Sequence, residues 1–158
     1  MKLLFVCTGN TCRSPMAEAV AKVVFPKEGY EIASAGLAVP APSDASENAQ
    51  IASREVGLDL TNHQSHQITP EDIAGADLIL TMTKAQKMAL SAACQAAKTP
   101  LFTLTEFAGM ADRDISDPYG CGLEIYRQCL DEIIDAVKAC AQILTKDGPA
   151  RGAKKETK

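Results

Sequence analysis

Aromatic side chains are scarce in this chain of 158 residues: they make up 4% of it, and tryptophan is absent. Only two histidines, His63 and His66, are present, and they do not form a convincing ligand set for a catalytic metal. No apolar run reaches the about 18 residues that a membrane span needs, and the short, strand-like N-terminus lacks the features of a signal peptide. We therefore expect a cytoplasmic protein that uses neither a metal nor another cofactor and does not bind a membrane.

Positive charge is also scarce outside the C-terminal end of the chain. The formal net charge is −4, yet residues 146–158 hold five basic and two acidic residues, so the rest of the chain is acidic. An acidic body argues against nucleic acid as the main partner. Residues 1–145 have the length of a single domain. Residues 146–158 contain no large apolar residue, and we expect a disordered basic tail there, with a functional basic arm as the alternative.

Six cysteines are present, but their spacing does not follow that of a small disulfide-rich secreted domain. Cys94, Cys129 and Cys140 occupy helical patterns, and we expect them to be small core residues. Cys121 follows a turn, and the pattern leaves its role open. Cys7 and Cys12 lie in a loop whose chemistry is considered below.

The hydrophobic pattern alternates between strands and helices. Nearly continuous apolar runs predict buried strands at 2–6, 31–35, 77–82 and 100–104. Helical patterns cover 15–25, 45–56 and 84–95, and a last helix carries an apolar stripe at Leu123, Leu130, Val137 and Leu144. This alternation predicts an α/β fold with a parallel sheet, in which a ligand binds beyond the carboxyl ends of the strands. The irregular segments 36–44 and 105–120 would supply loops at that edge.

The first strand leads into a loop whose composition suits a phosphate group. The loop reads Cys7-Thr8-Gly9-Asn10-Thr11-Cys12-Arg13-Ser14, and the next residue, Pro15, suits the first turn of a helix. The free N–H groups and the positive dipole end of that helix would face an anion in the loop. Arg13 offers a planar fork of donors for two phosphate oxygens, and the same field favours the thiolate of Cys7. The loop therefore predicts a nucleophile beneath a bound phosphate.

Such a reaction also needs a proton donor for the leaving atom. Attack by the thiolate would form a phosphocysteine, which water then hydrolyses. Asp117 is the candidate general acid and base, because Pro118 stiffens the turn that contains it. Asp114 is the alternative, three residues earlier and without the proline. We expect Tyr119 to form a wall of the pocket rather than to take part in the chemistry.

These motifs resemble the low-molecular-weight protein phosphatases, also called low-molecular-weight protein tyrosine phosphatases, over about residues 1–145. The resemblance rests on the run from Val6 to Glu18, on residues 34–36, 76–83 and 117–120. It implies a three-layer sandwich, in which helices flank a central four-stranded parallel sheet and the phosphate-binding loop follows the first strand. It also implies a hydrolase that acts on phosphorylated proteins through a phosphocysteine intermediate.

The same resemblance implies roles for individual residues. Cys7 would be the nucleophile, Arg13 the phosphate clamp and Asp117 the general acid. Asn10 would hold the conformation of the loop, and Ser14 would hydrogen-bond the Cys7 thiolate. The remaining phosphate-binding residues would be Thr8, Gly9, Thr11 and Cys12. Cys12 either packs in the loop or forms a reversible disulfide with an oxidised Cys7.

Thr11 bears on the choice of substrate. Tyrosine-directed members of the family usually carry a bulky aliphatic residue at this position, whereas threonine resembles the bacterial protein arginine phosphatase subgroup. An apolar wall favours an aromatic ring, and a guanidinium prefers a polar neighbour and a carboxylate, which Asp117 would supply. Residues 62–65 and 124–128 also resemble that subgroup, and the rim segment 36–44 has no aromatic residue. We therefore expect phosphoarginine to be favoured.

Three other functions remain as alternatives. A protein-tyrosine phosphatase differs only in the side chains around the pocket. An arsenate reductase needs a relay of two further cysteines, and the region near position 80 reads Thr81-Met82-Thr83 instead. A non-catalytic redox or anion sensor would need no general acid, which Asp117 would supply. The sequence leaves the oligomeric state open, with a monomer favoured.

Overall fold

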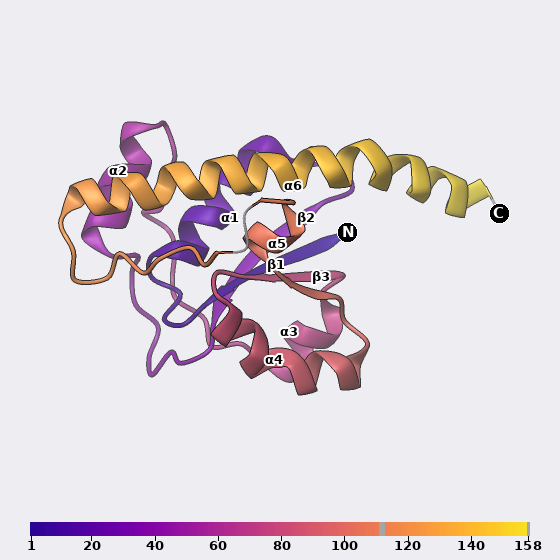
Figure 1. Ribbon diagram of the computed structural model, residues 1–158, viewed down its shortest axis with the longest axis horizontal. Helices are drawn as coiled ribbons and strands as arrows, with labels where there is room; N and C mark the ends of the chain where they lie inside the picture. The colour runs from indigo at the N-terminus through magenta and orange to yellow at the C-terminus, as the bar shows by residue number, and fades with distance from the viewer. Residues whose placement is uncertain (111–112, 158) are drawn as a thin grey trace.

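The computed structural model describes residues 1–110 and 113–157, with side chains up to Lys146. Its strands and helices alternate in the expected manner (Figure 1). The strands are β1 (Lys2–Cys7), β2 (Glu31–Gly36), β3 (Leu78–Thr81) and β4 (Leu101–Thr103). The helices are α1 (Arg13–Val24), α2 (Glu47–Glu55), α3 (Pro70–Gly75), α4 (Lys84–Ala97), α5 (Leu104–Phe107) and α6 (Leu123–Thr157).

The four strands form one parallel sheet in the order β2-β1-β3-β4, which confirms the predicted fold class. Strand β1 pairs with β2 on one side and with β3 on the other. The carboxyl end of β1, at Cys7, is therefore the place where the chain turns to different sides of the sheet, and this is where open α/β sheets bind ligands. Cys7 lies beside Gly36 of β2 in the strand register.

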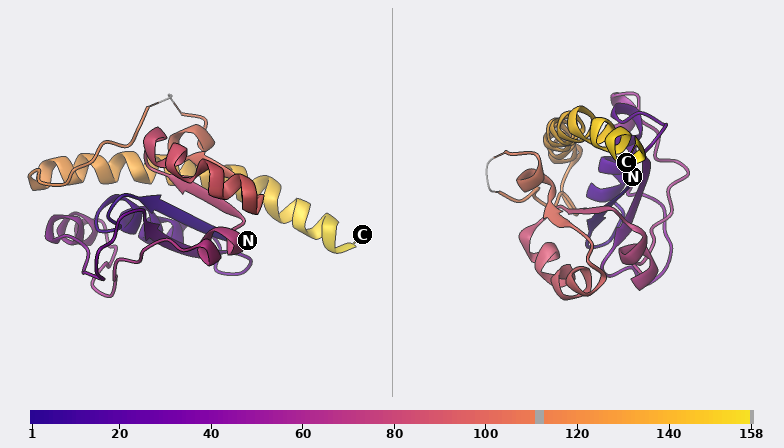
Figure 2. Two further views of the ribbon diagram at one scale, coloured as in Figure 1. Left: turned by 90° about the horizontal axis from the view of Figure 1, so that it is seen from below. Right: turned by 90° about the vertical axis from the view of Figure 1, so that its right-hand side faces the viewer.

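Helices cover both faces of the sheet, so the sandwich has three layers (Figure 2). Alternate residues of β1 point to opposite faces, as the two-residue period of a strand requires. Leu3, Phe5 and Cys7 belong to the large core beneath α1, α2 and α6, whereas Leu4 and Val6 pack with α3 and α4. Burial on both faces explains why the strands are apolar at nearly every position.

Two short helices lie where the hydrophobic pattern predicted none. Helix α3 begins after Thr69 and helix α5 after Thr103, and each starts with a capping box in which an acidic residue three positions later completes the exchange of hydrogen bonds. Helix α5 occupies the start of the segment 105–120 that was predicted to be irregular throughout, so that prediction was wrong for this first turn. Both helices are too short for an apolar period to reveal them.

Helices α1 and α6 each differ from the expected range at one end. Helix α1 begins at Arg13 rather than at Ser14 or Pro15, which brings the arginine into the first turn. Helix α6 continues to Thr157, through most of the segment for which the composition predicts a disordered tail. The side chains from residue 147 onward, and residue 158 altogether, lie outside the described part of the chain. The division into a domain at 1–145 and a tail at 146–158 therefore stays a prediction.

Two further features concern the length of the helices and the burial of the cysteines. Within the described residues, no helix is both long enough and apolar enough to cross a membrane. Cys94, Cys129 and Cys140 are buried in the core, as predicted, and Cys121 is exposed. All six cysteines are free thiols.

Candidate active site

A pocket of about 220 Å³ opens at the carboxyl end of β1. Its lining consists of residues that the sequence singled out for phosphate chemistry: Cys7, Thr8, Gly9, Thr11, Cys12, Arg13, Asp117 and Tyr119. The first six come from the end of β1, from the loop that follows it and from the first turn of α1, and the last two come from the segment before α6. Two further predicted residues, Asn10 and Ser14, are fully buried and do not line the pocket.

Cys7 is the last residue of β1, and it receives polar contacts from the loop that follows. Its Sγ accepts a hydrogen bond from the backbone N–H of Asn10 at 3.2 Å and lies 2.9 Å from Ser14 Oγ. The side chain is almost entirely buried, at 3% exposure, yet it lies at the base of the pocket. Hydrogen bonds to sulfur favour its charged form, so this environment suits a thiolate.

Asn10 gives the loop its turn. Its φ is 56°, in the left-handed region that asparagine adopts more readily than most residues. Its amide Nδ2 donates to Ser14 Oγ at 2.7 Å and to Ser34 Oγ at 3.0 Å, and its Oδ1 accepts from the backbone N–H of His66 at 2.9 Å. All the hydrogen-bonding groups of this buried amide are therefore engaged with one partner or more, as its burial requires.

Arg13 carries a buried positive charge into the pocket. Its side chain is 5% exposed, and its Nη1 donates to the carbonyl oxygen of Ile115 at 2.9 Å. Its Nη2 lies 3.5 Å from Asp117 Oδ2. A buried guanidinium needs such partners, and it lines the same pocket as the Cys7 sulfur. The position of Arg13 in the first turn of α1 adds the positive end of that helix to the same space.

Asp117 lies at the mouth of the pocket, and its side chain is 55% exposed. Its Oδ1 accepts the backbone N–H of Tyr119 at 3.0 Å, which fixes the turn around Pro118. Asp114 does not line the pocket, and its Oδ1 accepts the backbone N–H of Lys84 at the start of α4. Of the two carboxylates considered from the sequence, Asp117 is therefore the one that lines the same pocket as Cys7.

Thr11 and Cys12 form the wall toward α2 and α6. The backbone oxygen of Thr11 accepts the N–H of Ser46, the residue that caps α2. Cys12 Sγ lies 3.3 Å from Ser46 Oγ and 3.4 Å from the hydroxyl of Tyr126. Burial and the contact with Cys12 raise the pKa of Tyr126 to about 12. These contacts fit the packing role for Cys12, and the alternative of a disulfide with Cys7 stays a prediction.

The structure also brings up residues that the sequence did not single out. The ring of His63 contacts the backbone oxygen of Asn10 at 2.7 Å through Nε2, although no role was assigned to this histidine. Gln86 of α4 donates from Nε2 to Thr8 Oγ1 at 3.1 Å. The pattern of Thr83 followed three residues later by Gln86 is a capping-box signal and could have marked the glutamine. No local signal points to His63 or to the Ile115 carbonyl, because only the fold brings them to the loop.

The other buried thiols are unsuited to a relay with Cys7. Burial raises the pKa of Cys129 and of Cys140 to about 12, so both stay protonated near neutral pH. Cys94 packs against the opposite face of the sheet from Cys7. Within the described ranges, no group of three or more His, Cys, Asp or Glu side chains is placed to hold a metal ion.

Comparisons with known proteins agree with this geometry. Residues 2–150 match the family "Low molecular weight phosphotyrosine protein phosphatase". A protein-arginine-phosphatase of Bacillus subtilis is 38% identical over 93% of this chain and 99% of its own length. The low molecular weight protein-tyrosine-phosphatase PtpB of Staphylococcus epidermidis is 38% identical over 87% of this chain and 94% of its own.

A solved structure of the YwlE arginine phosphatase superposes with a TM-score of 0.86 at 37% identity, over 93% of this chain and 97% of that one. It is described as a C7S mutant with a phosphorylated active-site serine, so in that protein the phosphoryl group reaches the side chain that replaces a cysteine. The match over almost the whole length, in sequence and in fold, shows that this chain belongs to the low molecular weight phosphotyrosine protein phosphatase family and is a protein phosphatase, a hydrolase.

Proposed function

We propose that this phosphatase hydrolyses phosphoarginine in proteins, with Cys7 as nucleophile, Arg13 as phosphate clamp and Asp117 as general acid and base. The observation that carries the choice of substrate is the absence of a bulky aliphatic side chain from the lining of the pocket, as far as the structure describes it. Within the described part of the chain, no aliphatic side chain longer than threonine lines the pocket, and Thr11 occupies the loop position where a phenyl ring would need an apolar surface. A guanidinium would instead meet the Thr11 hydroxyl and the Asp117 carboxylate.

In the first step, the Cys7 thiolate attacks phosphorus while the bond from phosphorus to the arginine nitrogen breaks. Asp117 gives its proton to that nitrogen, so arginine leaves with its normal charge. In the second step, water attacks the phosphocysteine, the sulfur leaves as a thiolate, and Asp117 takes the proton from water. Arg13 and the backbone N–H groups of the loop stabilise the charge on the phosphoryl oxygens in both steps. Phosphate is released and no external reactant besides water is consumed.

The contacts within the site support these roles. The Asn10 N–H and the Ser14 hydroxyl lie against the sulfur, where they favour the thiolate as nucleophile and as leaving group. Asp117 lies 3.5 Å from Arg13, at the exposed end of the pocket where a substrate side chain would enter. The expected outcome for Cys7→Ser is the loss of turnover with phosphate binding retained, whereas a non-catalytic sensor would have no turnover to lose.

Phosphotyrosine is the second candidate substrate, and one observation favours it. Tyr119 lines the pocket mouth and is 74% exposed, so its ring is free to stack on a phenyl ring. The relative in Staphylococcus epidermidis is named a tyrosine phosphatase. The remaining alternative, an arsenate reductase, lacks support because the other buried thiols are not placed for a relay.

The test compares kcat/KM for phosphoarginine and phosphotyrosine in peptides of otherwise identical sequence. We expect a preference for phosphoarginine of about a hundredfold, which corresponds to about 2.7 kcal/mol of differential transition-state stabilisation. Thr11→Val keeps the shape of the side chain and removes only its hydroxyl, and Thr11→Ile also adds bulk. Both variants should lower the preference, the second more strongly. A preference for phosphotyrosine in the unaltered enzyme would refute the choice of substrate and leave the nucleophile unaffected.

We also propose that the enzyme acts in the cytoplasm, as a monomer and without nucleic acid. Six free thiols, of which Cys121 is exposed, are typical of a reducing compartment. The acidic net charge of −4 disfavours binding to nucleic acid. Sedimentation of the full chain tests the monomer.

A further inference from the structure

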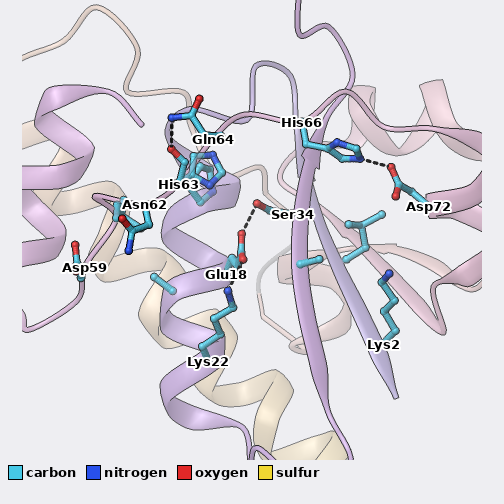
Figure 3. Close-up of a pocket in the computed structure, with 15 residues that line it drawn as sticks. Lys2, Glu18, Lys22, Ser34, Asp59, Asn62, His63, Gln64, His66 and Asp72 are labelled. Carbon is cyan, nitrogen blue, oxygen red and sulfur yellow. Dashed lines mark hydrogen bonds and ion pairs between the residues drawn. The ribbon is translucent and has the colours of Figure 1, made fainter. Parts of the chain in front are cut away.

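A second pocket, the back pocket, has a volume of about 460 Å³ and is lined by residues of α1, of β2 and of the segment 59–66, but not by Cys7 (Figure 3). Its polar lining includes Glu18 and Lys22 of α1 and Ser34 of β2, together with His63 and His66. Figure 3 shows the Glu18 carboxylate directed at the Ser34 hydroxyl, with Lys22 on its other side. Ser34 also contacts Asn10 of the loop. The back pocket is therefore connected to the front one through buried polar side chains.

The connection is a continuous chain of four hydrogen bonds. It runs from Glu18 Oε1 to Ser34 Oγ at 2.5 Å, from Ser34 Oγ to Asn10 Nδ2 at 3.0 Å, from Asn10 Nδ2 to Ser14 Oγ at 2.7 Å, and from Ser14 Oγ to Cys7 Sγ at 2.9 Å. Asn10 and Ser14 are fully buried, and Ser34 is 8% exposed. Water therefore has little access to the middle of this chain.

The chemistry of the two ends determines which group donates in each of the four hydrogen bonds. A carboxylate only accepts hydrogen bonds, so the Ser34 hydroxyl donates to Glu18 and its oxygen is left to accept from Asn10. The His66 N–H holds the oxygen of the Asn10 amide, which leaves both amide hydrogens for Ser34 and Ser14. Ser14 then accepts from Asn10, and its single hydrogen is free to point at Cys7. The two hydroxyls therefore donate outward, Ser34 to Glu18 and Ser14 to the sulfur, and the Asn10 amide between them donates to both.

We propose that Glu18 is a positioning residue for the nucleophile: it anchors Ser34 and Asn10, and through them it holds the Ser14 hydroxyl in the orientation that stabilises the Cys7 thiolate. This inference rests on the proposed role of Cys7 and deepens it. The Asn10 amide is held between Ser34 and Ser14, so fixing the Ser34 hydroxyl also fixes the geometry in which Asn10 donates to Ser14. Without it, the Ser34 hydroxyl loses its acceptor, and the contact between Ser34 and Asn10 is no longer held in place.

A direct field effect of Glu18 would act with the opposite sign. A negative charge on α1 repels a thiolate, so its removal would favour ionisation of Cys7. Lys22 Nζ, at 2.7 Å from Glu18 Oε2, offsets that charge. The other titratable groups near the two ends are Cys12, Arg13, Asp117 and Tyr119 in the front pocket, and Lys2, Asp59, His63, His66 and Asp72 in the back pocket.

The experiment measures the rate of alkylation of Cys7 against pH, with the modified peptide identified by mass spectrometry because Cys121 also reacts. Glu18→Met keeps the size of the side chain and removes the acceptor. We expect the half-maximal point to move to higher pH by about half to one unit, so that the rate on the acidic limb of the profile falls about threefold to tenfold. The acidic limb of kcat/KM should move with it.

Two further variants keep the test decisive. Glu18→Gln retains an oxygen that can accept from Ser34, and we expect it to recover at least half of the shift, which a loss of folding would not allow. Lys22→Met removes the ion pair and leaves the chain of hydrogen bonds, so its alkylation profile should stay within twofold of the unaltered enzyme. An unchanged or downward shift in Glu18→Met would overturn the proposal. The profile reports the ionisation of Cys7 whichever phosphorylated residue is the substrate, so it is independent of the preference for phosphoarginine.

Discussion

The substitution Gly36→Ala is expected to displace the phosphate-binding loop, although Gly36 itself is not part of that loop. Gly36 is the last residue of β2 and lies beside Cys7 in the register of the sheet. A Cβ at this position would lie 2.8 Å from the backbone oxygen of Thr8, 3.0 Å from Asn10 Cβ and 2.6 Å from Val39 Cγ2, whereas ordinary contact begins at 3.4 Å. The valine side chain can turn away, but the oxygen belongs to the backbone of the loop. Thr8 and Asn10 must therefore move by several tenths of an ångström.

The size of the effect follows from this displacement. Overpacking of a tight site costs about 1–3 kcal/mol, which lowers the Tm of a domain of this size by about 2–12 °C and leaves it folded. Catalysis should suffer more, because misplacement of catalytic groups by about 1 Å can cost about a hundredfold in rate. We expect kcat/KM to fall by about ten- to a hundredfold, together with a weaker inhibition by inorganic phosphate. The assay is hydrolysis of the phosphorylated peptides beside urea unfolding of the same preparation.

Gly75→Ala is the matched control. Gly75 ends helix α3, and a Cβ there meets nothing within 4 Å. Alanine at this position should leave activity unchanged and stabilise the fold by up to about 1 kcal/mol. The reasoning is refuted if Gly36→Ala keeps full activity and phosphate affinity, since the loop would then absorb the methyl group without moving its binding groups.

Two further outcomes are expected. Asp117→Asn should lower kcat by about a hundred- to ten-thousandfold at unchanged affinity for inorganic phosphate, and a loss under tenfold would exclude this residue as the general acid. Burial favours the neutral form of Asp72, but hydrogen bonds from His66 and Thr69 outweigh it and hold its pKa below 3.8. Its carboxylate therefore adds stability above pH 3.8, which is lost as the pH falls through the folded-state pKa. Asp72→Asn should cost about 1 kcal/mol in urea unfolding at pH 7, and a difference that persists at pH 2 would contradict this.

The sequence by itself determined the fold class and the chemistry of the loop, because both depend on contiguous residues. The strand that ends at Cys7, the loop and the first turn of α1 form one uninterrupted segment, and the spacing of Cys7 and Arg13 needs no distant contact. Alternation of apolar strands with amphipathic helices likewise predicts a parallel sheet from local periods alone. Asp117 was distinguishable from Asp114 because the proline that follows it is a local signal.

Only the tertiary structure decided how the loop is supported. Ser34, His63 and His66 reach Asn10 because β2 pairs beside β1 and the segment after α2 passes behind the loop. Pairing in a sheet depends on register and order of strands, which no residue pattern within one strand encodes. The Ile115 carbonyl that accepts from Arg13 is a backbone group, and every residue has one, so the sequence does not indicate which carbonyl Arg13 contacts. Long-range hydrogen bonds between small polar residues are set by packing, and so the anchoring of the nucleophile by Glu18 became visible only in the folded chain.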